Sequence, residues 1–411
     1  MRSVAIVGSG PAGLYCAEAL LKASPDVRVD VIDRLPTPFG LVRSGVAPDH
    51  QSTKGVARLL DRVLAKPDVA FFGGVELGRD VSLDELRAAY DAVAIATGAA
   101  CDRTLGIPGE SLPGVYASGR FVGWYNHHPD HADVDLAGVR TAIAIGAGNV
   151  ALDVARILAK TPDEFAGSDL APEVSAALAA ATLERIRIVG RRAATAMKFT
   201  AGELLELRDL ARAKTELGAG TRIEDLDGAA GTALAEVVAA ADETKPLSLV
   251  FDFGLVPVAF EGDGRLERVR FRAADGTDRV IDAQLAVTCV GYETHGHDLE
   301  RDAGALRNVD GRIDAALYAV GWAKRGPSGT IPTNRSEAQL VAKTIVADFG
   351  DASRNDGRAR LTALLARRGV AYVGYDAWRR IDLSEIARSG DARVRRKWRS
   401  HDALHAAATA T

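Results

Sequence analysis

The first residues that could do chemistry form a glycine fingerprint close to the N-terminus. It has the spacing G-x-G-x-x-G and comprises Gly8, Gly10, Pro11, Ala12 and Gly13. An apolar strand pattern at residues 3–7 precedes it, and a helical pattern follows it to Ala23. In this order the first glycine permits a tight turn, the second lets the backbone approach a pyrophosphate, and the third lets helix and strand pack closely. Free N–H groups at the helix start favour phosphate oxygens, so the segment predicts a dinucleotide site.

An acidic residue supports that interpretation. Asp33 follows a second apolar run, Val27–Ile32, and lies twenty residues beyond Gly13. A carboxylate at this place can accept hydrogen bonds from ribose hydroxyls. The alternative is a tight strand-to-helix turn without a ligand, but the coincidence of strand, glycines and acid favours the dinucleotide.

A second fingerprint lies between the apolar strand Thr141–Ile145 and another helical pattern. It comprises Gly146, Ala147, Gly148, Asn149 and Val150, and Ala151 stands at the third glycine position, where alanine is tolerated. The acid position of this unit carries Arg191 and Arg192 instead. Guanidinium groups bind a ribose 2′-phosphate in a bidentate way, so the pair predicts NADP rather than NAD. The alternative is a solvated arginine pair.

A third segment whose residues could contact a cofactor follows the apolar pattern that ends at Gly321. Its candidate residues are Trp322, Gly329, Thr330 and Ile331. Such a loop can place backbone N–H groups and one aromatic ring against a flat cofactor. It can equally be an ordinary loop with a core tryptophan, and the spacing alone leaves both open.

The elements that must position these segments are those of a mixed α/β protein with more than one core. The chain has 411 residues, which favours two domains. Its formal net charge of −4 gives no reason to expect nucleic acid or a membrane surface as a partner, and no apolar run approaches the roughly 18–20 residues that span a bilayer. The N-terminus lacks the pattern of a secretion signal.

Cysteine usage agrees with a reducing compartment. Cys16, Cys101 and Cys289 are far apart, odd in number and without a C-x-x-C pair. This argues against a disulfide framework, a structural zinc site or an iron–sulfur cluster on this chain, and we expect a cytoplasmic location.

Together the blocks resemble the adrenodoxin-reductase-like ferredoxin–NADP⁺ reductases, a family with bacterial and mitochondrial members. Residues 35–50, LPTPFGLVRSGVAPDH, nearly match its signature loop, with Phe39 where Trp or Tyr also occurs. Further blocks that resemble the family follow in order and span nearly the whole chain: residues 4–14, 121–126, 146–156, 189–192 and 321–334. We identify the chain as a bacterial member.

The resemblance implies a fold and a function. The fold is α/β with two Rossmann-like dinucleotide-binding domains, the NADP domain being inserted into a split FAD domain. We place the FAD domain at 1–107 and 297–411 and the NADP domain at 108–296. The implied cofactors are FAD and NADP(H). The implied reaction passes hydride from NADPH to FAD, and then single electrons to a ferredoxin-type iron–sulfur protein.

The resemblance also implies contacts that spacing alone does not give. For FAD these are Ala12, Asp33, Leu41 and Val75, with Trp322 and Gly329 to Ile331 at the flavin ring. For NADP they are Arg103, Ala147 to Val150, Arg191, Arg192 and Glu203, and Gly329 is expected to touch both cofactors. His50 and Glu206 match positions near the isoalloxazine, where they would handle a proton or position the nicotinamide, although His50 could equally be structural. Asp33 departs from the usual Glu, and residues 193–200 lack the family's Gly-Pro.

The histidines at residues 127–131 and the basic tail each have a functional and a purely structural interpretation. His127, His128 and His131 lack helical metal-ligand spacing and a remote ligand set, so no metal site is predicted. The basic tail Arg393–Arg399 could dock an acidic ferredoxin, but it could also be a solvated helix face or, as the resemblance indicates, part of the fold.

Other functions remain as alternatives. A dithiol oxidoreductase also uses FAD and NADPH, but the chain has no C-x-x-C. A flavin monooxygenase, an oxidoreductase acting on a small molecule or quinone, and a non-catalytic NADP-binding redox sensor are the others.

Overall fold

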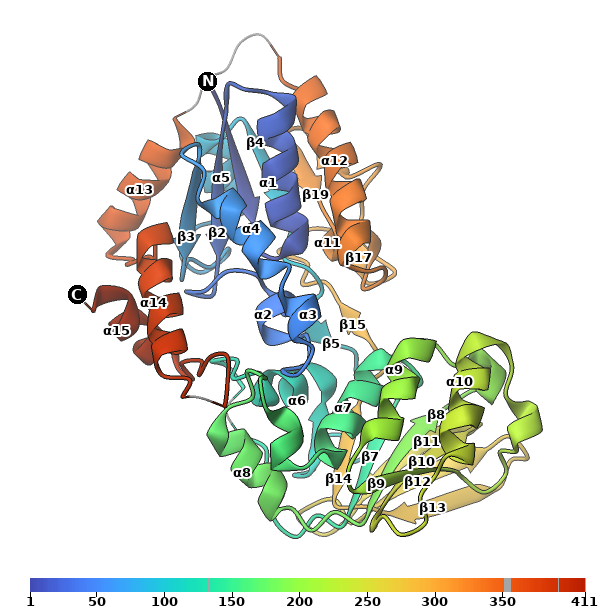
Figure 1. Ribbon diagram of the computed structural model, residues 1–411. Helices are drawn as coiled ribbons and strands as arrows, with labels where there is room; N and C mark the ends of the chain where they lie inside the picture. The colour runs from blue at the N-terminus through green and yellow to red at the C-terminus, as the bar shows by residue number, and fades with distance from the viewer. Residues whose placement is uncertain (132, 351–355, 391, 411) are drawn as a thin grey trace.

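The computed structural model describes residues 1–131, 133–350, 356–390 and 392–410. Two lobes are each built around a six-stranded sheet (Figure 1). We call the lobe with both chain ends the split domain, because its sheet takes strands from residues 2–95 and 312–319. The other lobe is the inserted domain, whose sheet takes strands from residues 115–288.

The sheet of the split domain has the order β18-β19-β4-β1-β2-β3 and is parallel except for β18. Its strands are β1 (Arg2–Val7), β2 (Val27–Asp33), β3 (Val69–Gly73), β4 (Ala92–Ile95), β18 (Arg312–Asp314) and β19 (Leu317–Ala319). The chain runs outward from β1 to β2 and β3 and then returns to β4 on the other side of β1. Ligands of open α/β sheets bind at such a reversal, outside the carboxyl ends of the strands.

Helices cover both faces of this sheet. One face packs against α1 (Pro11–Ala23), α4 (Ala57–Leu64) and α12 (Ile331–Ala347), and the other against α5 (Leu83–Ala89) and α13 (Gly357–Arg368). Leu14 and Leu20 of α1 are fully buried against the strands. Ser82 caps α5 and exchanges hydrogen bonds with Glu85, as the capping pattern in the sequence predicts.

The inserted domain has an all-parallel sheet of order β6-β14-β7-β8-β10-β9. The strands are β6 (Val115–Ala117), β7 (Thr141–Ile145), β8 (Arg185–Gly190), β9 (Ala213–Leu217), β10 (Leu247–Phe253) and β14 (Leu285–Thr288). Here the order reverses between β7 and β14, which places a second ligand position at Gly146.

The two faces of the inserted sheet are covered differently. Helices pack on one face: α6 (Ser118–Tyr125), α7 (Asn149–Ala159), α8 (Pro172–Ala180), α9 (Ala201–Leu205) and α10 (Gly228–Ala239). An antiparallel sheet packs on the other: β11 (Leu255–Glu261), β12 (Arg268–Ala273) and β13 (Asp278–Asp282).

The chain crosses between the two lobes twice, and the two crossings lie next to each other (Figure 1). The outgoing strand β5 (Cys101–Asp102) pairs antiparallel with the returning strand β15 (Tyr292–Glu293). A small hairpin of β16 (Arg301–Asp302) and β17 (Ala305–Leu306) follows the return. The fold is therefore the split arrangement that the resemblance implied.

Three local elements differ from what the sequence pattern indicates. The amphipathic pattern over residues 54–65 predicts one helix, but the structure has α3 (Gln51–Lys54) and α4, with a break at Gly55. The Pro- and Gly-rich residues 36–49 predict a loop, but they contain one helical turn, α2 (Leu41–Ser44). The pattern also predicts a helix from about Ser336, but α12 begins at Ile331, because Pro332 fits the first turn of a helix and Thr330 and Thr333 form a capping box.

The C-terminal residues form further helices that pack against the split domain. The segment between the last two helices, α14 (Tyr375–Ala387) and α15 (His401–Thr409), contacts the inserted domain. Trp378 of α14 packs edge-on against Phe39. The segment 392–400 then runs along the inserted domain before α15 returns to α14. No helix in the described ranges is both long and apolar enough to cross a membrane.

Candidate functional site

The first fingerprint forms an open cradle at the end of β1. Gly8 has φ 115° and lies so close to the residue after β4 that an added Cβ would stand 2.3 Å from the Ala96 carbonyl oxygen. Only glycine fits there. Gly10, the N-cap of α1, has no atom within 4 Å of such a Cβ, and no side chain caps the helix. The first N–H groups of α1 therefore face open space, which suits a pyrophosphate.

The second fingerprint repeats this construction in the inserted domain. A Cβ on Gly146, whose φ is 155°, would stand 2.4 Å from the carbonyl oxygen of Cys289, just after β14. Gly148 caps α7 without a side-chain bond, and nothing lies within 4 Å of its added Cβ. Next to each sheet, one glycine has no room for a side chain because the residue after a neighbouring strand lies too close. A second glycine leaves open space that a ligand can occupy.

Asp33 lies beside the first cradle, as predicted, and is partly engaged. One of its carboxylate oxygens accepts hydrogen bonds from Ser9 N (2.8 Å) and Ser9 Oγ (2.5 Å), and the other accepts from Leu35 N (2.9 Å). These bonds fix the carboxylate at the cradle. The shorter arm of Asp is thus held by Ser9 at the end of β2.

The signature loop at residues 35–50 leans over the first cradle. Phe39 N donates to Ser9 O (3.0 Å), and a Cβ on Gly40 would stand 3.2 Å from the Cα of Gly10. Leu41, the first residue of α2, belongs to this loop and is 50% exposed, a large value for an apolar side chain. Val75 is buried and its N–H donates to Asp33 O (2.9 Å). Both predicted FAD contacts therefore lie next to the cradle.

The Trp322 loop closes the same region from the other end of the chain. A Cβ on Gly321 would stand 2.4 Å from the Cβ of Ala12, so the loop abuts the start of α1. Trp322 stacks on Tyr292 with ring centroids 6.3 Å apart, and its Nε1 donates to Ser328 O (2.9 Å). Gly329 and Thr330 are exposed and Ile331 begins α12. Nearby, Thr97 Oγ1 is buried with no hydrogen-bond partner in the described residues, an unfilled polar position after β4.

The predicted phosphate clamp is available for a ligand. Arg191 and Arg192 are exposed just after β8, and neither guanidinium has a hydrogen bond or ion pair with any residue that the structure describes. Arg103 differs, because its Nε donates to Tyr292 O (3.1 Å) and its Nη2 to Ala303 O (3.4 Å). Arg103 therefore braces the two chain crossings, a structural duty that the sequence did not indicate.

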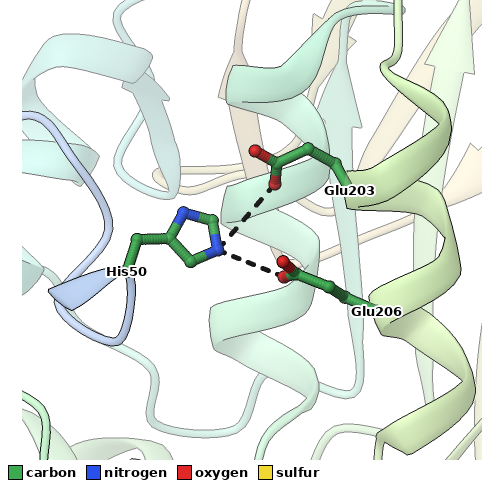
Figure 2. A group of neighbouring side chains, drawn as sticks. All are labelled: His50, Glu203 and Glu206. Atoms are coloured by element: carbon green, nitrogen blue, oxygen red, sulfur yellow. Dashed lines mark hydrogen bonds and ion pairs between the residues drawn. The ribbon is translucent and has the colours of Figure 1, made fainter. Parts of the chain in front are cut away.

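The two predicted catalytic residues meet at the domain junction. His50, on the split domain, has its Nε2 3.1 Å from Glu206 Oε2 and 3.8 Å from Glu203 Oε2 of the inserted domain (Figure 2). The other ring nitrogen, Nδ1, is 4.0 Å from Asp153 Oδ1. The imidazole is 17% exposed, so solvent reaches part of the ring.

A continuous set of contacts connects this histidine with both cradles. Asn149, in the first turn of α7, exchanges hydrogen bonds with Thr200, whose N donates to Asn149 Oδ1 (2.9 Å). Thr200 is the N-cap of α9, the helix that carries Glu203. His50 ends the loop that covers Gly10. Each helix start is therefore linked to one side of the His50–Glu206 contact, the start of α1 through the loop at residues 35–50 and the start of α7 through Thr200 and α9.

Charged side chains from the loop at residues 35–50 and from α7 surround this contact. Arg156 is fully buried and pairs with Asp49 and, at 2.7 Å, with Asp153. Burial raises the pKa of Asp49, but Arg156 and Lys160 outweigh it and lower the pKa to about 2. Burial raises the pKa of Asp153 and, together with the charge on Asp153, that of Glu203. The i, i+3 spacing of Asp153 and Arg156 was the available signal.

The basic tail is a clasp between the domains. Lys397 is buried and its Nζ lies 2.8 Å from Asp169 Oδ2, to which Lys54 also donates (2.9 Å). Burial lowers the pKa of Lys397 well below its usual range in spite of Asp169. The backbone joins as well, since Val394 N donates to Ser168 O (3.0 Å). Of the interpretations offered for the tail, a part of the fold is confirmed and a solvated helix face is wrong.

In the histidine run, His128 Nδ1 accepts a hydrogen bond from Asp130 N, and Asp130 pairs with Arg34 and His401. Both ring nitrogens of His127 are buried without a hydrogen-bond partner among the described residues. All three cysteines are unpaired, and burial raises the pKa of the Cys16 thiol to about 12.

Comparison with known proteins agrees with these features. The sequence profile of the pyridine nucleotide-disulphide oxidoreductases matches residues 2–319. NADPH-ferredoxin reductase FprA of Mycobacterium tuberculosis is 39% identical over 428 residues, covering 93% of this chain and 94% of that protein. The mitochondrial NADPH:adrenodoxin oxidoreductase of Arabidopsis thaliana is 36% identical over 436 residues, covering 93% and 90%. The solved structure of M. tuberculosis FprA in complex with NADPH superposes with a TM-score of 0.93 at 36% identity over 100% of both chains.

Both the profile and the relatives cover most of the chain, and the fold agrees with the two-sheet arrangement described above. The chain therefore belongs to the pyridine nucleotide-disulphide oxidoreductase family, in the group that contains the NADPH-ferredoxin and NADPH:adrenodoxin reductases.

Proposed function

We propose that the protein is an FAD-dependent reductase that takes hydride from NADPH and gives electrons, one at a time, to a ferredoxin-type iron–sulfur protein. The observation that carries the proposal is the contact of His50 and Glu206 between two domains that each carry an open glycine cradle. The names of the relatives, which specify NADPH with ferredoxin or adrenodoxin, supply the substrate classes.

The FAD end of the proposal uses the split domain. The start of α1 binds the pyrophosphate through Gly10, Pro11 and Ala12, and Asp33 accepts from the ribose. Leu41, Val75 and the Trp322 loop line the remainder, with Gly329, Thr330 and Ile331 at its far end. When bound, FAD accepts a hydride and releases single electrons, which lets a two-electron donor serve a one-electron acceptor.

The NADPH end uses the inserted domain. The start of α7, residues Ala147 to Val150, binds the pyrophosphate. Arg191 and Arg192 hold the 2′-phosphate, because guanidinium groups pair strongly with phosphate. Glu203 lies at the domain junction beside His50, and Arg103 lies at the two chain crossings between the domains.

At the junction, this chain positions the reacting groups rather than attacking them. His50 and Glu206 reach the site from opposite domains, where they would position the nicotinamide end or handle a proton near the flavin ring. The clasp of Lys54, Lys397 and Asp169 holds the domains in this relation. Holding two reacting groups in alignment is the main contribution a protein makes to hydride transfer.

We further propose the limits of the parts: 1–107 and 297–411 for the FAD domain, and 108–296 for the NADP domain. The unpaired state of all three cysteines supports a cytoplasmic location.

The proposal is tested with the purified protein. We expect a yellow protein whose flavin absorbance bleaches under anaerobic NADPH, and which reduces cytochrome c only when a [2Fe–2S] ferredoxin is added. A colourless protein that binds NADP⁺ would favour the redox-sensor alternative, and rapid oxygen consumption without ferredoxin would favour a monooxygenase.

A further inference from the structure

The cluster that joins the domains has the composition and spacing of a cation site. His50, Glu203 and Glu206 each offer one ligand atom, and these three atoms lie within 4.8 Å of one another. Imidazole nitrogen and carboxylate oxygen are the ligands that zinc-type divalent cations accept, and such ions stand about 2.0–2.2 Å from each. Shifts of a few tenths of an ångström in side chains at the surface of the junction would bring all three atoms to that distance.

A carboxylate, that of Asp153, also lies near the other side of the His50 ring. The ring of His50 presents Nε2 to the two glutamates and Nδ1 to Asp153 Oδ1, 4.0 Å away. A histidine that binds a cation through one nitrogen almost always donates its other N–H to a carboxylate or carbonyl, which fixes the ring. Asp153 is held in place by Arg156 at 2.7 Å, so this outer carboxylate is already ordered.

The ligand atoms also lack full protein partners. Glu203 Oε2 is buried and makes no hydrogen bond with any described residue, although a buried carboxylate oxygen normally has one. Arg156 Nε lies 3.5 Å from Glu206, but the charges of His50 and Arg156 do not outweigh burial, Asp153 and Glu206, which together raise the pKa of Glu203. A cation at the centre would satisfy the free oxygen and relieve the repulsion.

Among the described residues, the histidine run at 127–131 is not part of such a group. His128 Nδ1 accepts a hydrogen bond from Asp130 N, and Asp130 pairs with Arg34 and His401. In the ranges that the structure describes, no other group of three His, Cys, Asp or Glu ligand atoms lies as close together as the His50 group. The inference therefore concerns one place in the fold.

We propose that His50, Glu203 and Glu206 form a binding site for a zinc-type divalent cation, with Asp153 orienting the histidine. Three protein ligands leave one coordination position for water. His50 belongs to the split domain and both glutamates to the inserted domain, so the bound ion bridges the two. Since the proposed function places the nicotinamide end at the same residues, and the inference rests on it in this respect, Zn²⁺ acts as a reversible inhibitor of flavin reduction by NADPH.

The test measures binding of Zn²⁺ alone to the flavin-loaded protein after treatment with a chelator. Equilibrium dialysis of the parent is expected to show one saturable site per chain. His50→Gln, Glu203→Gln and Glu206→Gln each remove a ligand and are expected to weaken this site at least tenfold. Asp153→Asn, which alters only the outer carboxylate, is expected to weaken it roughly 10- to 100-fold.

The matched control is His401→Gln, which removes an exposed histidine that pairs with a carboxylate elsewhere. It is expected to bind Zn²⁺ like the parent. Absence of a saturable site in the parent, or a site that survives His50→Gln and disappears with His401→Gln, overturns the proposal. Flavin absorbance confirms that each variant is folded and loaded, so loss of binding through misfolding is recognised.

Stopped-flow reduction by NADPH separates this inference from the proposed function. Zn²⁺ at saturating concentration is expected to slow bleaching of the flavin, and a chelator to restore it. If the protein binds Zn²⁺ through His50 but NADPH never bleaches the flavin, the cation site stands and the proposed function fails. If NADPH bleaches the flavin and dialysis shows no site, the reverse holds.

Discussion

His50 and Glu206 lie in contact across the domain junction, with 3.1 Å between Nε2 and Oε2, although they are 156 residues apart in the chain. His50 ends the loop that covers the first glycine cradle, and Glu206 follows the helix whose N-cap, Thr200, is bound to the second cradle. One contact therefore reports whether the two cofactor domains are correctly placed.

The arginine clamp should determine which dinucleotide is used. Arg191→Ala combined with Arg192→Ala is expected to raise KM for NADPH and to leave KM for NADH nearly unchanged. Charge-assisted contacts are worth roughly 1.5–3 kcal/mol each, so the NADPH/NADH preference should fall by more than about tenfold. Arg185→Ala is the control, since Arg185 is an exposed arginine at the opposite end of β8. An unchanged preference in the double variant would contradict the clamp.

The two glycines of the second cradle should respond differently to the same change. Gly146→Ala places a Cβ 2.4 Å from the Cys289 carbonyl at a φ of 155°, so we expect a lower Tm and a loss of folded protein. Gly148→Ala meets no protein atom within 4 Å and has an allowed φ of −135°, so Tm should be unchanged. Its methyl group instead fills the cradle and should raise the Kd for NADPH. Equal effects on Tm would argue against a ligand at Gly148.

The clasp of Lys54, Lys397 and Asp169 should make a large contribution to the free energy of unfolding. Asp169→Asn leaves Lys54 and Lys397 buried beside each other without a carboxylate, and breaking a buried pair in this way costs about 3–5 kcal/mol. Urea unfolding measures this. Arg399→Ala removes only the exposed pair with Asp133 and should cost at most about 1 kcal/mol. If the two variants were equally stable, the tail would not be a clasp.

Acid should weaken the junction through Asp49. Its pKa is lowered to about 2 in the folded protein, below the ordinary value near 3.8. A carboxylate with a depressed pKa stabilises the fold fully above its unfolded pKa, and this contribution is lost as the pH falls through the folded pKa. The free energy of unfolding of the parent, relative to Asp49→Asn, should therefore decrease by about 2 kcal/mol between about pH 5 and about pH 2. A constant difference over this range would contradict the Asp49–Arg156 pairing.

Local chemistry was the predictable part of this protein. The strand, glycines and helix of each cradle follow one another in the sequence, and α1 has the bounds that the pattern predicts. Arg191 and Arg192 were identifiable because they replace an acid at a fixed place after a strand. Their side chains are exposed and unpaired among the described residues, which agrees with that interpretation.

The junction was not predictable from local pattern, because its contacts join residues far apart in the chain. Lys397 and Asp169 meet only because the tail crosses to the inserted domain. Arg103 was expected at NADP, yet its guanidinium also holds the returning crossing at Tyr292 and Ala303. The start of α12 was missed because Pro332 suggests a loop, although proline is compatible with the first turn of a helix.

The most direct test of the central claim is anaerobic stopped-flow mixing of the flavin-loaded protein with NADPH. The account predicts bleaching of the flavin absorbance by NADPH, weaker bleaching by NADH, and a slower rate in His50→Gln with unchanged flavin content. Adding an oxidised [2Fe–2S] ferredoxin should then restore the flavin absorbance as the ferredoxin is reduced. A flavin that stays oxidised under NADPH would contradict the account.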